Sequence, residues 1–325
     1  MKQNKKIVVI GGGTGTFVVI SGLKSYPVDL TALVTVADSG GSTGRLRDEF
    51  GFLPVGDLRQ ALAALAQNGD QTWIQDILLY RFSKGSGLDG HNLGNLILTA
   101  LQDLTGSTAK AVETTAKIFR LHGHIYPITT QNVDLVIEYS DGSFVIGEHH
   151  LNPATLGGKK IKQVRLSPTA KIYTPAAASL KQADLICIGP GDLYASLLSN
   201  LVVSGLKKIF NESTARLVYV VNLMTSYTQT HGMSASDHLN KIEKYIGKPV
   251  DYVIINQQPV TPKIRALYRA QHEYPVVDDL PHNHRIIRAN LITTKKAAMV
   301  IGDTLKRSYL RHDQHKLAMT IMQLL

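Results

Sequence analysis

Five short runs of aliphatic residues, each followed by a polar or glycine-rich turn, most limit how this 325-residue chain can fold. In each run most of the residues are apolar on both faces of the expected strand, which is typical of a parallel sheet covered by helices on both faces. We therefore expect an α/β fold with a doubly wound, mostly parallel sheet. The runs cover residues 6–10, 30–36, 184–188, 217–221 and 251–255.

Between these runs, apolar residues recur at the spacing of one helix face, which predicts crossover helices. Asp57 stands at the start of one such segment, and we expect its side chain to cap that helix. The predicted helices cover residues 15–23, 57–66, 74–82, 93–104, 109–121, 193–203, 236–246 and 312–324.

The middle of the chain departs from this alternation. Residues 133–139 and 143–149 resemble two strands joined by a tight turn at Asp141-Gly142, and residues 162–166 would add a third. We expect a β-rich insertion at about residues 125–178, on the edge of one α/β unit. A small second domain is the alternative, since a chain of this length holds one large or about two ordinary domains.

Composition excludes several classes of protein. Lysine and arginine outnumber aspartate and glutamate by 35 to 25, a formal charge of +10, but they are spread along the chain and aromatic residues are only 6%. General nucleic-acid binding is therefore not expected, and a basic balance concentrated at one pocket for an anionic ligand is favoured. The single cysteine, Cys187, excludes a disulfide framework and a cysteine-rich metal site.

The aliphatic run at residues 7–10 is too short for a signal peptide. No apolar run approaches the roughly 18 residues that a membrane span requires. We therefore expect a soluble, cytoplasmic protein without a membrane span.

The first predicted strand leads into Gly11-Gly12-Gly13-Thr14-Gly15, the first candidate for chemistry. Such a turn lets backbone amides approach phosphate oxygens, and the following helix adds its partial positive charge. The dinucleotide fingerprint G-x-G-x-x-G fails because its third glycine would fall at Thr16, and no Walker lysine follows. The sequence favours an anion site here over a tight turn without a ligand.

The second predicted strand leads into a turn that begins with a carboxylate and ends in arginines. Arginine guanidinium groups suit phosphate, and a carboxylate after strand two suits ribose hydroxyls. A plain flexible loop is the alternative. The candidate ligand-binding residues of this turn are Asp38, Ser39, Gly40, Gly41, Ser42 and Arg45.

Asn92 and Asn95 are three residues apart at a predicted helix start, so both amides could read a nucleobase or a sugar. Helix capping by Asn92 is the alternative. Later polar residues fall at the ends of the remaining strands, where ligands of doubly wound folds bind. These are Gly189, Gly191, Asp192, Asn222 and Asn256.

The remaining sequence patterns are weaker candidates for a functional site. The histidine pairs 122/124, 149/150 and 282/284 lack a third ligand at a diagnostic spacing, so no protein metal site is predicted. Arg311, in Leu310-Arg311-His312-Asp313, could close on an anion from the far end of the chain. The alternative for this segment is a helix start capped by Asp313. No residue is assigned a catalytic role.

Taken in order, six motifs resemble one known family. They are I-G-G-G-T-G, V-A-D-S-G-G-S-T-G-R-L-R, G-D-L-R, G-H-N-L-G-N, I-G-P-G-D-L-Y-A-S-L-L and L-R-H-D, and they span residues 10–313. The combination is similar to the bacterial gluconeogenesis factor family, the YvcK-like proteins. That family is related to the CofD-like superfamily of 2-phospho-L-lactate transferases.

This resemblance implies one Rossmann-like domain over residues 1–325 with an insertion. It also implies a cytoplasmic role in growth on gluconeogenic carbon sources and in cell shape and wall synthesis, with binding of UDP-sugars such as UDP-N-acetylglucosamine. In the transferase relatives, the matching positions Gly12, Gly13, Thr14 and Asp38 hold phosphate groups.

Two functions follow from the resemblance. The first is a UDP-sugar-binding regulatory protein without turnover; the second is a transferase that moves a phosphate-linked group with the help of Mg²⁺. The transferases carry adjacent acidic residues after strand two, whereas here Ser39 follows Asp38, which removes one expected metal ligand. An NAD-type binder is a weaker third hypothesis, and a homo-oligomer is compatible with the sequence.

Overall fold

A computed structural model of the chain describes residues 4–37, 41–66, 72–147, 151, 159–293 and 309–325. Its centre is a seven-stranded sheet in the order β10-β9-β8-β7-β1-β2-β3, and every neighbouring pair is parallel. The predicted mostly parallel sheet is therefore confirmed. The strands are β1 Lys5–Gly11, β2 Val28–Val34, β3 His124–Pro127, β7 Leu185–Ile188, β8 Arg216–Val220, β9 Tyr252–Asn256 and β10 Ile286–Ala289.

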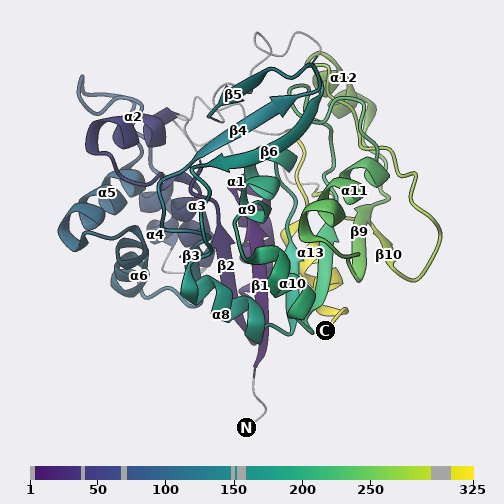
Figure 1. The fold of residues 1–325 in the computed structure, drawn as a ribbon, viewed down its shortest axis with the longest axis horizontal. Helices are drawn as coiled ribbons and strands as arrows, with labels where there is room; N and C mark the ends of the chain where they lie inside the picture. The colour runs from purple at the N-terminus through teal and green to yellow at the C-terminus, as the bar shows by residue number, and fades with distance from the viewer. Residues whose placement is uncertain (1–3, 38–40, 67–71, 148–150, 152–158, 294–308) are drawn as a thin grey trace.

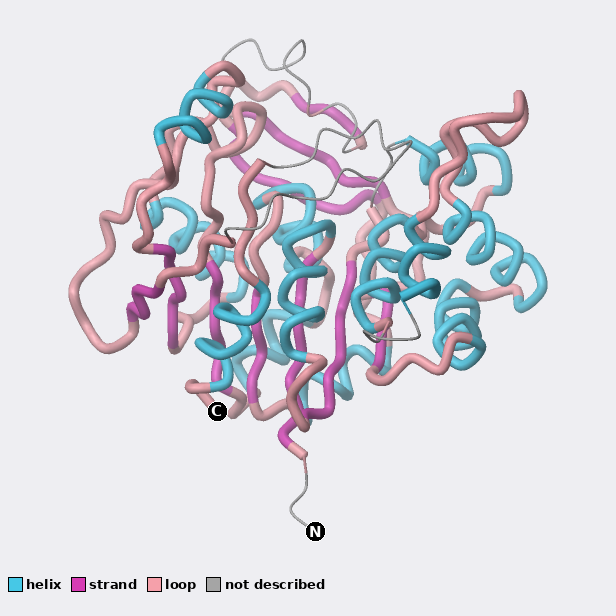
Figure 2. The backbone as a smooth tube through the Cα atoms, turned by 180° about the vertical axis from the view of Figure 1, so that it is seen from behind, coloured by secondary structure: helices cyan, strands magenta, loops and turns pink. Residues whose placement is uncertain are grey.

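Helices cover both faces of this sheet, as Figures 1 and 2 show from opposite sides. Within the described part, α1 packs against α3 and α13, while α8 packs against α10 and the sheet. The helices are α1 Gly13–Leu23, α2 Gly41–Phe50, α3 Gly56–Leu65, α4 Thr72–Leu79, α5 Leu93–Thr105, α6 Thr108–Ile118, α8 Thr174–Gln182, η2 Leu193–Leu198, α9 Ser199–Leu201, α10 Leu206–Glu212, α11 Ala235–Ile246, α12 Pro262–Arg269 and α13 Gln314–Met322.

The central strands are buried on both faces, because each is flanked by two strands and covered by two layers of helices. Ile7, Val8, Val9 and Ile10 of β1 are at most 1% exposed, and β7 is buried throughout. Burying an aliphatic side chain stabilises the fold by roughly 1.5–3 kcal/mol. The continuous apolar runs of the sequence are thus explained by the position of these strands in the sheet.

A second, antiparallel sheet in the order β5-β4-β6 lies across the carboxyl ends of the main sheet (Figure 1). Its strands are β4 Asp134–Tyr139, β5 Phe144–Ile146 and β6 Ile161–Ser167. The Tyr245 hydroxyl of α11 accepts a hydrogen bond from the Val164 amide at 3.0 Å, which ties β6 to the helical layer. Residues 148 and 149 of the predicted hairpin lie outside the described residues.

Three predictions differ in detail from the structure. The insertion was expected to span residues 125–178, but β3 is the edge strand of the main sheet and α8 covers that sheet, so only β4, β5 and β6 form the separate sheet. The predicted helix at 193–203 begins with the π-helical turn η2. Asp57 does not cap α3, because Val55 occupies the N-cap and Asp57 lies in the first helical turn.

No helix in the described part of the chain combines the length and the apolar character that crossing a membrane would require.

Candidate functional site at the switch point of the sheet

The order of the main sheet creates one topological switch point, between β1 and β7. From β1 the chain adds β2 and β3 on one side, and β7 to β10 then extend the other side. In open α/β sheets, ligands bind outside the carboxyl ends of the strands at such a point. The turn after β1 and the turn after β7 therefore flank the expected site.

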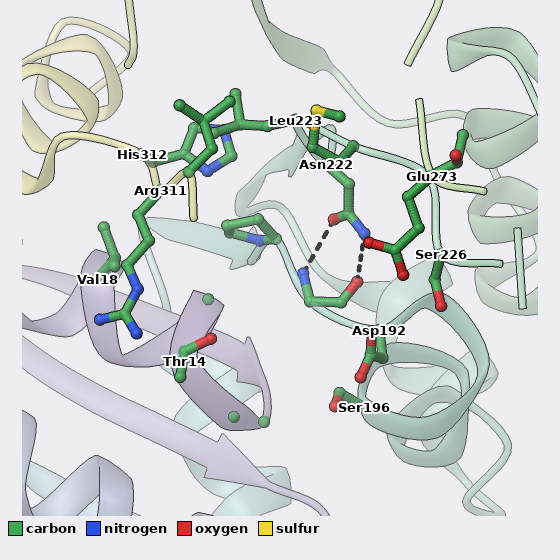
Figure 3. A pocket seen from close by; sticks show the side chains of 18 of the residues that line it. Thr14, Val18, Asp192, Ser196, Asn222, Leu223, Ser226, Glu273, Arg311 and His312 are labelled. Atoms are coloured by element: carbon green, nitrogen blue, oxygen red, sulfur yellow. Dashed lines mark hydrogen bonds between the residues drawn. The ribbon is translucent and has the colours of Figure 1, made fainter. Parts of the chain in front are cut away.

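A cavity of about 320 Å³ opens there. Its lining comes from the turns after β1, β7 and β8, the segment after β9 and the segment before α13 (Figure 3). The lining residues are Gly12, Gly13, Thr14, Gly15, Val18, Pro190, Gly191, Asp192, Ser196, Asn222, Leu223, Met224, Thr225, Ser226, Tyr268, Glu273, Leu310, Arg311 and His312.

The glycine-rich turn after β1 is packed closely against two neighbours. Gly13 starts α1, and its amide donates to the Asp57 carboxylate at 3.0 Å. A Cβ atom at Gly12 would overlap that carboxylate, and a Cβ atom at Gly15 would overlap the Pro190 carbonyl. These glycines therefore allow other protein groups to approach the backbone closely, and the first residues of α1, Gly13, Thr14 and Gly15, line the cavity.

The turn after β7 is held by Asn222. The Gly191 amide donates to Asn222 Oδ1 at 3.0 Å, and Asn222 Nδ2 donates back to the Gly191 carbonyl at 2.7 Å (Figure 3). Asn222 thus lines the cavity and also fixes the turn that carries Asp192. Gly189 follows β7, with its amide donating to the Ile10 carbonyl at 3.0 Å, and does not line the cavity.

Asp192 precedes η2, lines the cavity and is exposed to solvent as a residue. The protein atoms around its carboxyl group nevertheless exclude part of the water there, and this desolvation raises the pKa of Asp192 above its ordinary range. The amide end of η2 is itself occupied, because Gln229 Oε1 accepts from the Tyr194 and Ala195 amides at 3.2 and 3.3 Å. π-helical turns of this kind occur frequently at functional sites.

Arg311 reaches the cavity from the segment before α13 and extends past Val18 toward Thr14 (Figure 3). Its neighbour His312 is 7% exposed, and burial lowers the pKa of the imidazole to about 4. Asp313 caps α13 by accepting from the His315 and Lys316 amides at 3.0 and 3.1 Å, so the predicted capping is also present.

The sequence predicted that basic residues gather at one ligand pocket, and the described lining residues of the cavity do not show this. Arg311 stands opposite two carboxylates, Asp192 and Glu273, and His312 is neutral above its lowered pKa of about 4. The +10 charge of the chain therefore lies mostly elsewhere. Among the described residues, no group of three or more histidine, cysteine, aspartate or glutamate side chains is arranged to hold a metal ion.

Several predicted ligand residues form a separate buried cluster at the start of α5. Asn92 caps α5 through Asn95, whose side-chain amide contacts Ser42 at 3.4 Å and whose oxygen accepts from Arg59 at 2.8 Å. Arg45 is exposed and donates to the Asp89 carbonyl at 3.3 Å. None of Ser42, Arg45, Asn92 and Asn95 lines the cavity.

The remaining predicted residues are placed as follows. Gly41 begins α2, Gly11 ends β1 outside the cavity lining, and Asp38, Ser39 and Gly40 lie outside the described residues. Asn256 ends β9, and its side-chain oxygen accepts from the Gln258 amide in the following loop at 3.2 Å and from the Leu291 amide after β10 at 3.0 Å.

Sequence reasoning missed Asp57 as a partner of the glycine-rich turn, and it missed Ser196, Ser226, Tyr268 and Glu273 as lining residues. The G-D-L-R run that contains Asp57 was visible, but its contact with Gly13 bridges 44 positions. No local pattern marks the others.

Comparison with known proteins identifies the family of this chain. The model of the 2-phospho-L-lactate transferase CofD family matches residues 7–297. The chain belongs to the CofD family. This CofD-family chain is 37% identical to the gluconeogenesis factor of Halalkalibacterium halodurans, over 99% of this chain and 97% of the relative. It is also 37% identical to the gluconeogenesis factor of Bacillus subtilis, over 100% and 99% of the two chains.

A crystal structure of a UPF0052-family protein from Bacillus halodurans has the same fold. It superposes with a TM-score of 0.88 at 36% identity and covers 99% of this chain and 100% of that one. The resemblance to gluconeogenesis factors and CofD-like proteins that the sequence motifs indicated is thus confirmed.

Proposed function

We propose that this CofD-family chain is a cytoplasmic factor that binds a UDP-sugar and acts in growth on gluconeogenic carbon sources and in cell shape. The names of its full-length relatives support a role related to gluconeogenesis. The observation that carries UDP-sugar binding is the cavity at the switch point, where the first turn of α1, the turn after β7 and Arg311 converge. Helix amides and a guanidinium group are donors suited to a diphosphate.

The mixed charge of the cavity supports a diphosphate that arrives together with a cation. Mg²⁺ typically binds one or two carboxylates and the phosphates of its substrate, while keeping several waters. Asp192 has the oxygen ligands for this role, and Glu273 lines the same cavity. The ion would neutralise part of the diphosphate charge beside these carboxylates.

A transferase is the second candidate, and the name of the matching family model favours it. In that case a phosphate-linked group would leave the nucleotide, and catalysis would rest mainly on positioning and electrostatic stabilisation. Product analysis separates the two candidates. A binding factor returns the UDP-sugar intact after incubation with Mg²⁺, whereas a transferase releases nucleotide when an acceptor is supplied.

The direct test is calorimetric titration with UDP-N-acetylglucosamine, UDP-glucose, GDP, NAD and phosphate, each with and without Mg²⁺. We expect saturable binding of at least one UDP-sugar and weaker binding of NAD and phosphate. Absence of binding by every uridine nucleotide would refute the proposal.

A genetic test addresses the cellular role. In a strain that lacks this gene, the parent chain should restore growth on a gluconeogenic carbon source and normal cell shape. Arg311→Ala should restore both less well, if the cavity is needed. Full complementation by a variant shown to have lost UDP-sugar binding would separate the growth role from the ligand.

A further inference from the structure

We propose that four aromatic side chains beside the cavity, Tyr227, His231, His272 and Tyr274, form a stacking surface for the nucleobase of the bound nucleotide. These four residues are called the aromatic rim below. The inference rests on the proposed binding of a uridine nucleotide, and it adds where the base lies and which side chains hold it.

The rings of the aromatic rim contact one another in a row. The centroids of His272 and Tyr227 are 5.0 Å apart, those of Tyr227 and His231 5.4 Å, and those of His231 and Tyr274 6.0 Å. Such contacts, mostly edge-to-face, are favourable arrangements for aromatic rings. The row is therefore held in place without a ligand.

The backbone contributes to the same rigidity. His231 Nδ1 donates to the His272 carbonyl at 3.1 Å, which joins the two loops and fixes the ring of His231. The Thr225 amide donates to the Tyr274 carbonyl at 2.7 Å, and the Tyr274 amide donates back to Thr225 Oγ1 at 3.0 Å. A rigid aromatic surface costs little conformational entropy when a ligand binds.

Two chain neighbours connect the aromatic rim to the cavity. Ser226, next to Tyr227, and Glu273, between His272 and Tyr274, both line the cavity and lie on the same side of it (Figure 3). A ligand whose diphosphate lies at the start of α1 would reach these rings by extending across the cavity.

The exposure of the rings leaves their faces accessible to a planar ligand. Tyr227 is 38% exposed and Tyr274 42%, and both histidines are exposed as well, so ring area is open to solvent. The cavity itself, at about 320 Å³, is at the small end for ligand pockets and is lined largely by polar groups and glycines. It suits a diphosphate and part of a sugar, which leaves a planar base to stack on aromatic faces outside it.

The test measures UDP and UDP-N-acetylglucosamine affinity by calorimetry for Tyr227→Ala, Tyr274→Ala, and the matching Phe variants. We expect each alanine variant to bind both ligands about tenfold more weakly, because stacking on the ring is lost. Each phenylalanine variant should stay within about twofold of the parent, because it keeps the ring. Circular dichroism and thermal unfolding confirm that the variants are folded, which the exposure of the rings favours.

Tyr80→Ala is the matched control, because Tyr80 is 48% exposed and follows α4, on the side of the sheet opposite α12 (Figure 1). It should leave both affinities unchanged. The proposal is overturned if both alanine variants bind UDP within twofold of the parent, or if the phenylalanine variants lose as much affinity as the alanine variants. Weaker binding of UDP-N-acetylglucosamine with unchanged UDP binding would place the sugar, and not the base, on these rings. If the parent binds no uridine nucleotide, the proposed function fails before this test begins.

Discussion

Asp57 determines the charge at the start of α1, where a ligand phosphate is expected. Its carboxylate accepts from the Gly13 amide at 3.0 Å and so stands at the position of an anion bound to the helix terminus. Asp57→Asn keeps an oxygen acceptor at this place and removes the negative charge. We expect UDP-sugar affinity measured without Mg²⁺ to rise about fivefold, the equivalent of about 1 kcal/mol. A fall in affinity would show that Asp57 contacts the ligand directly.

Arg311 and Arg45 were both predicted to face phosphate, and the structure separates them. Arg311 lines the cavity, whereas Arg45 is exposed at the Asp89 carbonyl. A charge-assisted hydrogen bond contributes roughly 1.5–3 kcal/mol. Arg311→Ala should therefore weaken UDP-sugar binding about tenfold to a hundredfold at physiological salt. Arg45→Ala should change the affinity less than about twofold, and equal losses in both variants would contradict this assignment.

Part of the cavity lining follows from the sequence for a physical reason. In a parallel sheet, strand ends with the same polarity meet at one edge, so Gly12, Gly191 and Asn222 come together although they are far apart in the chain. The contact of Asp57 with Gly13 could not be predicted, because it depends on how α3 packs against α1. The same holds for Glu273, which reaches the cavity from the segment after α12.

At the scale of elements, the packing of α1 against the turn after β7 depends on Gly15. A Cβ atom there would overlap the Pro190 carbonyl, which belongs to the backbone and cannot rotate away as the end of a side chain could. Gly15→Ala should therefore lower the thermal unfolding temperature and weaken UDP-sugar binding, because α1 must move away from the cavity. Gly87→Ala is the control, since a Cβ atom there has open space. If Gly15→Ala unfolds and binds like the parent, the close packing is not required.

The central strands of the main sheet could be predicted from the sequence, whereas its edge strands could not. β1 and β7 lie between two strands and two helical layers, which demands apolar residues at every position. The edge strands β3 and β10 are only partly buried, so their residues show no continuous apolar run. Helix α2 was missed because it begins Gly-Ser-Thr-Gly, residues with low helix propensity.

At the scale of the whole molecule, buried His312 links stability to pH. Burial lowers its pKa to about 4, while the unfolded chain has the ordinary value of about 6.5. Between these values the unfolded state binds more protons, so this contribution is complete above about pH 6.5 and is lost as pH falls toward about 4. We expect about 2 kcal/mol less stability from this residue at pH 5 than at pH 7.

Urea unfolding of the parent and His312→Gln at both pH values measures this contribution. The variant should be less stable at pH 7 but should lose less stability on acidification than the parent does. His238 is also buried, with its pKa lowered mainly by desolvation, and it contributes in the same direction in both proteins. Equal pH dependence in parent and variant would mean that His312 does not titrate in this range.

The central claim is that a UDP-sugar binds at the switch point between β1 and β7. Amide hydrogen exchange of the parent, with and without saturating UDP-N-acetylglucosamine, tests it most directly, because local opening is suppressed where a ligand contacts backbone amides. We predict slower exchange at residues 12–18 and 190–198, and smaller changes at residues 42–47 and 91–95. Saturable binding that leaves residues 12–18 and 190–198 unchanged would contradict the account and would place the ligand elsewhere on the molecule.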